Sequence, residues 1–189
     1  MRVAICRTEK VAALLAAAVV MGIAPSINAA AGAAGANAFA NIGIKNFGRM
    51  DDHFYRGAQP GEADFKALKG LGIKTIIDLR NDPKSYEKRD AEAAGMRYVN
   101  IPMSDSETPN GREIQQFLKI ANDPACWPFY VHCAGGRHRT GVMGAVYRMN
   151  HDGWNAAQAY KEMKQYDFYT HGGHGPLKHY VLDYSQGKN

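Results

Sequence analysis

One strand–loop–helix unit constrains the fold of this chain more than any other segment. Pro128–Val131 is a run of apolar, aromatic and β-branched residues, which predicts a buried strand that ends at His132. Residues 140–150 carry apolar side chains at helical spacing. Gly135 and Gly136 lie between the two segments and allow a tight loop. Such a unit points free N–H groups and the positive end of a helix dipole at one place, so it predicts an anion site.

The predicted loop contains a cysteine and an arginine separated by five residues. A helix N-terminus and nearby cations can lower a thiol pKa from about 8.5 to roughly 3.5–7.5, so Cys133 is predicted to be a nucleophilic thiolate. Arg139 offers a planar fork that suits two phosphoryl oxygens. Thr140 is placed to donate a hydrogen bond to the sulfur as it leaves, and His132 to orient the loop. The predicted phosphate-binding residues are Ala134, Gly135, Gly136, Arg137, His138 and Arg139.

These motifs resemble those of a known enzyme family. His132-Cys133-(x)5-Arg139-Thr140-Gly141 resembles the signature of the cysteine-dependent protein tyrosine and dual-specificity phosphatases. Phe54–Pro60 and Ile73–Arg80 resemble the opening strands of the compact dual-specificity members. Gly136–Gly141 is similar to the Gly-Lys-His-Arg-Thr-Gly segment of the atypical plant and fungal branch, with Arg137 in place of lysine.

The resemblance implies a phosphomonoester hydrolase that acts through a cysteinyl-phosphate intermediate. The implied substrates are phosphotyrosine or a broad, dual-specificity range of phosphoproteins. Some members of the atypical branch hydrolyse inositol pyrophosphates, so an inositol polyphosphate or pyrophosphate phosphatase is the alternative. Two readings from other classes are a non-catalytic phosphate-binding module and a sulfur-transfer or arsenate-reducing enzyme. Intact Cys133 and Arg139 argue against the module, and the lack of resolving cysteines argues against arsenate reduction.

A phosphatase also needs an acid that protonates the leaving group, a contribution of typically 10²–10⁴-fold. Residues 100–109 form a polar loop after a predicted strand, at the distance ahead of Cys133 that the resemblance leads us to expect. We predict Asp105 as this acid, with Glu107 as the alternative in the same loop. Both carboxyl groups could instead be ordinary loop acids, because the Trp-Pro-Asp form of this loop is absent.

The N-terminus predicts export. Three basic residues within the first ten precede an uncharged run over residues 11–24, which is shorter than the roughly 20 residues of a membrane span. Small residues follow, so residues 1–31 are predicted to be a signal peptide that is cleaved between 29 and 38. The protein is then periplasmic or secreted. An uncleaved anchor is the alternative.

Charge gives little support for a nucleic-acid partner. The chain has 23 Lys and Arg against 18 Asp and Glu, a net charge of +5. Loss of three basic residues and one acidic residue with segment 1–31 leaves +3. No basic stripe interleaved with aromatic residues is present in the sequence, so nucleic-acid binding is not expected.

The remaining pattern predicts one α/β domain. Residues 32–50 are predicted as a linker or N-terminal arm and residues 51–185 as the catalytic domain, which has the size of one domain with a single core. Strands that alternate with helices predict a protein-tyrosine-phosphatase-like fold, a central, mostly parallel sheet of four to five strands flanked by helices. A monomer is expected. The strands are predicted at 54–56, 74–79, 97–101 and 129–132, and the helices at 62–71, 84–94, 112–121, 140–150, 155–164 and 176–183.

Two further features bear on the site. Tyr166, Phe168, Tyr169 and the segment 171–175, which carries two histidines, are predicted to form a mobile wall of the pocket. No carboxylate or thiolate cluster accompanies the histidines, and the chemistry needs no metal or other cofactor. An extended strand between Cys126 and Cys133 holds their sulfurs apart, so the nucleophile is expected to be a free thiol.

Overall fold

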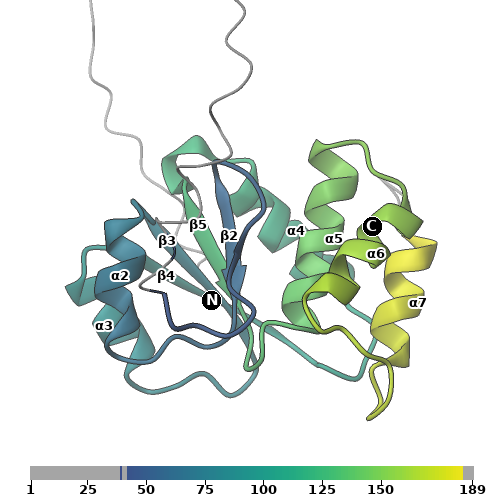
Figure 1. The fold of residues 1–189 in the computed structure, drawn as a ribbon, viewed down its shortest axis with the longest axis horizontal. Coiled ribbons are helices and arrows are strands. Elements are labelled where there is room, and N and C mark those ends of the chain that lie inside the picture. Colours follow the sequence, from purple (N-terminus) through teal and green to yellow (C-terminus); the bar gives the residue numbers. More distant parts are fainter. Residues whose placement is uncertain (1–38, 40–41, 185–189) are drawn as a thin grey trace, which may run out of the picture. The chain divides into compact units, whose positions relative to one another are not determined.

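The computed structural model describes residue 39 and residues 42–184 (Figure 1). The predicted signal peptide and its cleavage region, within residues 1–38, therefore lie outside the described residues. A compact unit begins at Ile42. Residues 42–50, which the sequence assigns to an N-terminal arm, are part of this unit, because Ile44 and Met50 are buried in it. None of the described helices is long and apolar enough to cross a membrane.

Five strands form one sheet in the order β1-β2-β5-β3-β4. Strands β2 (Phe54–Gly57), β5 (Phe129–His132), β3 (Thr75–Arg80) and β4 (Arg97–Met103) are parallel to one another. The short β1 (Gly48–Arg49) pairs antiparallel with β2 at one edge. The prediction of a mostly parallel sheet is thus confirmed. Because the four strands are parallel, the loops that follow them all leave from the same edge of the sheet.

Helices cover both faces of the sheet. Figure 1 shows α2 and α3 on one side, and α4, α5, α6 and α7 on the other. Helix α5 contacts β5 and β2, and α6 and α7 pack against α5. The helices are α2 (Asp64–Gly70), α3 (Glu87–Ala93), α4 (Gly111–Ala121), α5 (Arg139–His151), α6 (Ala156–Gln165) and α7 (Gly175–Asp183), with a short 3₁₀ turn η1 (Pro124–Cys126).

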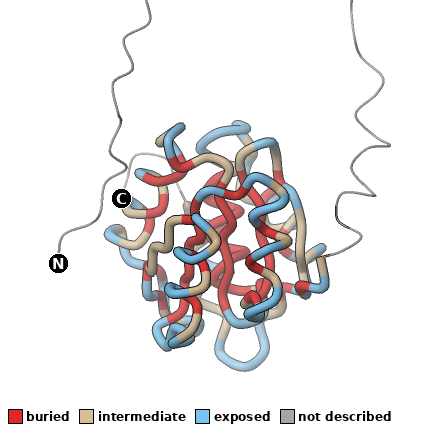
Figure 2. The backbone as a smooth tube through the Cα atoms, turned by 90° about the vertical axis from the view of Figure 1, so that its left-hand side faces the viewer, coloured by how far each residue is buried: buried red, intermediate tan, exposed pale blue. Residues whose placement is uncertain are grey.

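The core lies around the central strands, which Figure 2 shows as buried tubes in the middle of the molecule. All residues of β3 and β5 are buried, as expected for parallel strands that are covered on both faces. Phe54 packs against Phe129 with ring centroids 4.9 Å apart, and edge-on against Tyr147 of α5 at 5.0 Å. These aromatic contacts join β2, β5 and α5 into one rigid support for the loop between β5 and α5.

Local capping explains where two helices begin. Asn110 and Glu113 form a reciprocal capping box at the start of α4, and Asn155 and Gln158 do the same for α6. The helix predicted over residues 84–94 begins a turn later, at Glu87. In that turn the Tyr86 hydroxyl donates to the carbonyl oxygen of Pro60 at 2.9 Å, which holds the segment against the domain.

Candidate active site

The predicted anion site lies between β5 and α5. Strand β5 ends at His132 and α5 begins at Arg139, so the predicted strand, loop and helix are confirmed. We call residues 133–139 the anion loop. It leaves the carboxyl edge of the sheet from its central strand, which is the usual position of ligand sites in parallel sheets.

Carbonyl groups of the anion loop are bound on its outer side by the surrounding scaffold. The acceptors and their donors are Ala134 with the Gln59 N–H (3.3 Å), Gly135 with Asn46 Nδ2 (2.8 Å), Gly136 with Arg56 Nη2 (2.8 Å), Arg137 with the Gly141 N–H (3.2 Å) and His138 with the Val142 N–H (2.9 Å). In a planar trans peptide the C=O and the following N–H point in opposite directions. The N–H groups of residues 135–139 therefore face the inside of the loop, where an oxyanion can accept from them.

Two of these scaffold donors were not identified from the sequence as site residues. Arg56 is only 1% exposed, and burial lowers its pKa to about 10. Its guanidinium lies over the ring of Tyr166, 3.8 Å from the centroid. Asn46 adopts a positive φ of 53°, a conformation that asparagine tolerates better than most residues. The only sequence signal for Arg56 was its place inside the Phe54–Pro60 motif. Asn46 had no such signal.

The nucleophile has the environment that the chemistry requires. Cys133 is a free thiol, 3% exposed, and so has no disulfide to Cys126. Burial raises the pKa of Cys133, but hydrogen bonds from the hydroxyl and N–H of Thr140, the charge of Arg139 and the N–H of Gly136 outweigh burial and lower it overall. The Thr140 hydroxyl is fully buried and has no other hydrogen-bond partner in the described part of the chain. It is therefore available to the sulfur.

Arg139 is held in place through its Nη1. Its Nη1 donates to the carbonyl oxygen of Met103 at 3.2 Å and lies 3.5 Å from that of Leu79 and from Asn81 Oδ1. These partners stand at or just beyond the carboxyl ends of β3 and β4. The Nε of Arg139 is buried without a partner among the described residues. An unpaired buried donor is costly, so this atom is suited to a phosphoryl oxygen.

A buried charge cluster supports His132. The Nε2 of His132 lies 2.5 Å from Glu87 Oε1, and its Nδ1 lies 3.9 Å from Asp78 Oδ1, with all three side chains fully buried. Burial lowers the pKa of His132, but Glu87, Asp78 and the thiolate of Cys133 raise it more, so the net shift is upward. An imidazolium one residue before Cys133 favours the thiolate. The sequence carried no signal for Glu87.

The same three side chains form the one group of potential metal ligands within residues 42–184. Both oxygens of Asp78 and the Oε2 of Glu87 are already bound. Asp78 accepts from the Arg80 N–H and the Tyr98 hydroxyl, both at 2.8 Å, and Glu87 Oε2 accepts from Gln59 at 2.6 Å. We therefore interpret the cluster as a charged support for the loop.

Glu87→Gln is expected to raise the pKa of the Cys133 thiol by roughly half to one unit. The variant removes the charge that raises the pKa of His132, so the imidazolium is lost at a lower pH and no longer favours the thiolate. The measurement is the pH dependence of Cys133 alkylation by iodoacetamide. Glu92→Gln, in the same helix but exposed and paired with Lys88, is the control. An unshifted alkylation midpoint in Glu87→Gln with wild-type stability would contradict the role of the cluster.

Gly136→Ala is expected to disrupt the anion loop. Gly136 has φ +67°, and a Cβ there would lie 2.4 Å from the carbonyl carbon of Gly57 and 2.6 Å from the N of Ala58. Left-handed strain and overpacking together should lower the free energy of unfolding by about 2–4 kcal/mol. Gly135→Ala is the matched control, because the atom nearest to a Cβ at that position is in the flexible side chain of Arg137, 3.8 Å away. Urea unfolding and phosphate binding measure both; equal losses in the two variants would contradict this account.

The loop after β4 brings Asp105 toward the anion loop. Asp105 is exposed and raises the pKa of His138, so its carboxylate lies within electrostatic reach of that ring. Glu107 instead raises the pKa of Glu113 in the first turn of α4. Asp105 thus acts electrostatically on a residue of the anion loop, and Glu107 on the first turn of α4.

The rim carries the remaining predicted residues. Arg137 is half-buried, 3.8 Å from Asp167 and over the ring of Tyr169. His138 is buried, and burial, His174 and Arg137 lower its pKa to about 4. The side chain of Arg80, which ends β3, donates to Asp82 at 2.6 Å.

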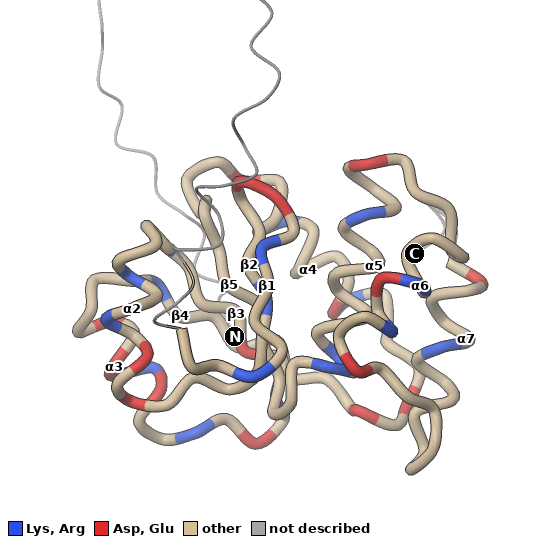
Figure 3. Tube along the Cα trace, in the orientation of Figure 1, with Lys and Arg blue, Asp and Glu red and all other residues tan. Residues whose placement is uncertain are grey.

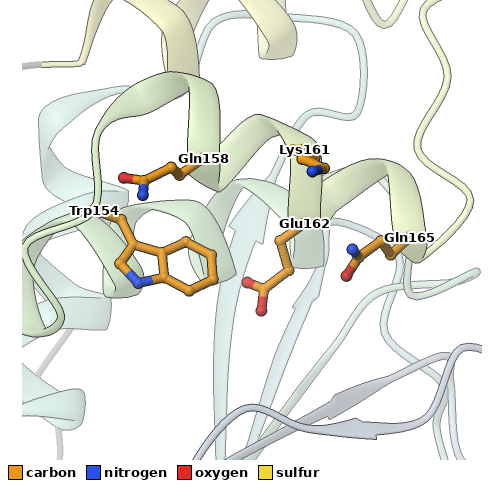
Figure 4. A pocket seen from close by; sticks show the side chains of 5 residues that line it. All are labelled: Trp154, Gln158, Lys161, Glu162 and Gln165. Atoms are coloured by element: carbon orange, nitrogen blue, oxygen red, sulfur yellow. The ribbon is translucent and has the colours of Figure 1, made fainter.

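A hollow on the described surface lies apart from the anion loop. It has a volume of about 200 Å³ and is lined by Trp154, Gln158, Lys161, Glu162 and Gln165, whose side chains are drawn in Figure 4. None of these residues belongs to the anion loop, and Glu162 forms an ion pair with Arg148 at 2.8 Å. Figure 3 shows Lys and Arg interspersed with Asp and Glu along the described chain, so neither sign dominates one region.

Comparisons with known proteins find similar phosphatases. The chain is 30% identical over 127 residues to the probable tyrosine-protein phosphatase DG1060 of Dictyostelium discoideum, a match that covers 64% of this chain and 75% of that protein. It is 26% identical to the dual specificity protein phosphatase TpbA of Pseudomonas aeruginosa over 69% of this chain, and spans 56% of that protein's length.

A solved structure shares the fold. The core catalytic domain of the PP-IP phosphatase SIW14 from S. cerevisiae superposes with a TM-score of 0.66 at 20% identity, covering 76% of this chain and 88% of that one. Residues 42–175 match the family model described as a DSP-PTPase phosphatase fused to NAD+ kinase. Because that match extends over more than half of the sequence, the chain belongs to this family of cysteine-dependent phosphatases.

Proposed function

We propose that this chain removes phosphate from tyrosine side chains of phosphoproteins, with a broader dual specificity that includes serine and threonine. The observation that carries the proposal is the free Cys133 thiol, whose pKa is lowered, inside a ring of inward-facing N–H groups. The names of the relatives, a probable tyrosine-protein phosphatase and a dual specificity protein phosphatase, support the same substrate class.

The reaction has two steps. In the first, the thiolate of Cys133 attacks phosphorus, the bond from phosphorus to the leaving oxygen breaks, and an acid gives that oxygen a proton. In the second, water attacks the cysteinyl phosphate, the same carboxylate takes the proton of the water, and inorganic phosphate departs as the thiolate re-forms. The inward N–H groups and the free Nε of Arg139 stabilise the equatorial oxygens in both steps. The Thr140 hydroxyl stabilises the departing sulfur.

We assign the acid role to Asp105. Its effect on the pKa of His138 supports a position beside the anion loop, whereas Glu107 acts on Glu113. Asp105 also lies two residues after Met103, whose carbonyl oxygen accepts from Arg139 at 3.2 Å. The guanidinium of Arg139 therefore links the anion loop to the loop that carries Asp105.

Trapping the intermediate tests the proposal. Enzyme mixed with ³²P-labelled phosphotyrosine peptide and quenched in acid should retain label on the peptide that contains Cys133. Hydrolysis without a labelled enzyme would contradict a cysteinyl-phosphate intermediate. If the peptide binds but is not hydrolysed, the chain is a non-catalytic phosphate-binding module.

An inositol polyphosphate is the second candidate substrate. Arg137 is only half-buried on the rim, and its nearest carboxylate, on Asp167, is 3.8 Å away, so it could meet a second phosphate. The fold shared with a PP-IP phosphatase keeps this candidate open. A panel of phosphotyrosine peptide, phosphoserine peptide and inositol polyphosphates, compared by kcat/KM, separates the two. Arg137→Ala should lower kcat/KM for the inositol polyphosphate selectively if that compound is the substrate.

We also propose that the protein is exported to the periplasm or the exterior. The basic N-terminus and the uncharged run after it support this. Cell fractionation with N-terminal sequencing of the recovered protein is the test. A start at residue 1 in the cytoplasmic fraction would contradict it.

A further inference from the structure

One histidine touches both loops of the active site. His174 lies at the end of the connection between α6 and α7, which Figure 1 shows at the same end of the molecule as the carboxyl ends of the strands. Its ring stacks on that of His138 with centroids 3.5 Å apart and an interplanar angle of 18°. Its Nδ1 lies 2.6 Å from the main-chain carbonyl oxygen of Asp105. Residues of the predicted wall thus join the anion loop to the loop that carries the proposed acid.

The surroundings fix the ring of His174 in this place. Tyr169 meets His138 edge-on at 4.4 Å and His174 at 5.4 Å. Gly173 lies beside the loop that carries Asp105, because a Cβ on Gly173 would be in van der Waals contact with Cβ of Ser106, at 3.6 Å. Gly172 and Gly173 have φ of +77° and +94°, a backbone that favours glycine, so the chain can turn sharply just before His174.

The contact to Asp105 requires a hydrogen on Nδ1 of His174. A carbonyl oxygen only accepts, so Nδ1 must carry the hydrogen. The neighbouring His138 is kept neutral by burial, by His174 and by Arg137, with Arg139 adding to the same effect and Asp105 opposing it. A neutral ring beneath His174 allows close stacking, whereas two imidazolium rings at this separation would repel each other.

We propose that His174 is a positioning residue that holds the loop bearing Asp105 over the anion loop. It does so through one hydrogen bond to the main chain of Asp105 and one ring stacked on His138. The inference rests on the proposed role of Asp105 as the acid. His174 itself transfers no proton and does not contact the reacting atoms. Its loss therefore affects the protonation of the leaving group, while the nucleophile is unchanged.

Two substitutions separate the contacts of His174. His174→Phe keeps a ring that can stack but removes the donor, and His174→Asn keeps a donor near the position of Nδ1 but removes the ring. The matched control is His179→Phe, because His179 is exposed on α7 and lies outside the predicted wall. Each variant is assayed with aryl phosphates of good and poor leaving groups, and Cys133 alkylation is measured in parallel.

We expect His174→Phe to lower kcat/KM about 10-fold for the poor leaving group, the loss of one hydrogen bond, and less than 3-fold for the good one. His174→Asn should recover most of this loss, and His179→Phe should match the wild type. Alkylation of Cys133 should be the same in all. Equal losses on both substrates in His174→Phe and His174→Asn, or a wild-type ratio in His174→Phe, would overturn the proposal.

Asp105→Asn, assayed beside these variants, separates the two failures. If Asp105→Asn shows the leaving-group effect and His174→Phe does not, the acid stands and the positioning role of His174 is wrong. If neither variant shows the effect, the assignment of Asp105 is itself wrong, and the inference falls with it.

Discussion

Cys133→Ser is expected to abolish turnover and to leave the anion site able to bind phosphate. A serine hydroxyl does not ionise near neutral pH, so the hydrogen bonds that lower the pKa of the Cys133 thiol cannot generate a nucleophile from it. The loss in kcat should be on the order of 10⁴-fold or more. The inward N–H groups and Arg139 remain, so inorganic phosphate should bind within a few-fold of the wild-type affinity.

Two measurements check this expectation together. A continuous assay with an aryl phosphate gives kcat, and calorimetric titration with phosphate gives the dissociation constant. Arg139→Lys is a useful comparison, because lysine keeps the charge but not the fork that spans two oxygens. We expect it to weaken phosphate binding where Cys133→Ser does not. Activity of Cys133→Ser within 10-fold of the wild type would mean that another group is the nucleophile.

Local patterns predicted the central part of the site. The apolar run 129–132 and the helical spacing after residue 139 each specify one element, and the anion loop is what remains between them. Because the nucleophile, Arg139 and Thr140 are all in this one segment, a single stretch of sequence was enough to place them. The parallel order of the sheet followed from the alternation of strands and helices.

What the sequence could not provide were the contacts between distant segments. Asn46, Arg56 and Glu87 bind the anion loop or His132 from positions 45 to 89 residues away along the chain. Each looks like an ordinary polar residue until the sheet brings it to the loop. The same holds for His174. The sequence assigned it to a wall of the pocket but did not predict its hydrogen bond to the carbonyl oxygen of Asp105. Tertiary folding, not periodicity, gives these residues their roles.

Asp105→Asn is expected to make the reaction strongly dependent on the leaving group. Asparagine has a similar size but no acidic proton, so an alkoxide or phenolate must depart without protonation. For a poor leaving group the loss in kcat/KM should be about 10²–10⁴-fold, and for an activated aryl phosphate much smaller. The parameter kcat/KM is the right one, because it covers only the steps through formation of the cysteinyl phosphate.

Glu107→Gln is the matched control for Asp105→Asn, since it removes a carboxylate from the same loop. Glu107 acts on Glu113, where its charge raises the pKa of a capping residue of α4, so its loss should leave the leaving-group dependence unchanged. A series of aryl phosphates with graded leaving-group pKa, assayed with both variants and the wild type, gives three slopes to compare. A steep slope for Glu107→Gln and a shallow one for Asp105→Asn would reverse the assignment, because the acid would then be Glu107.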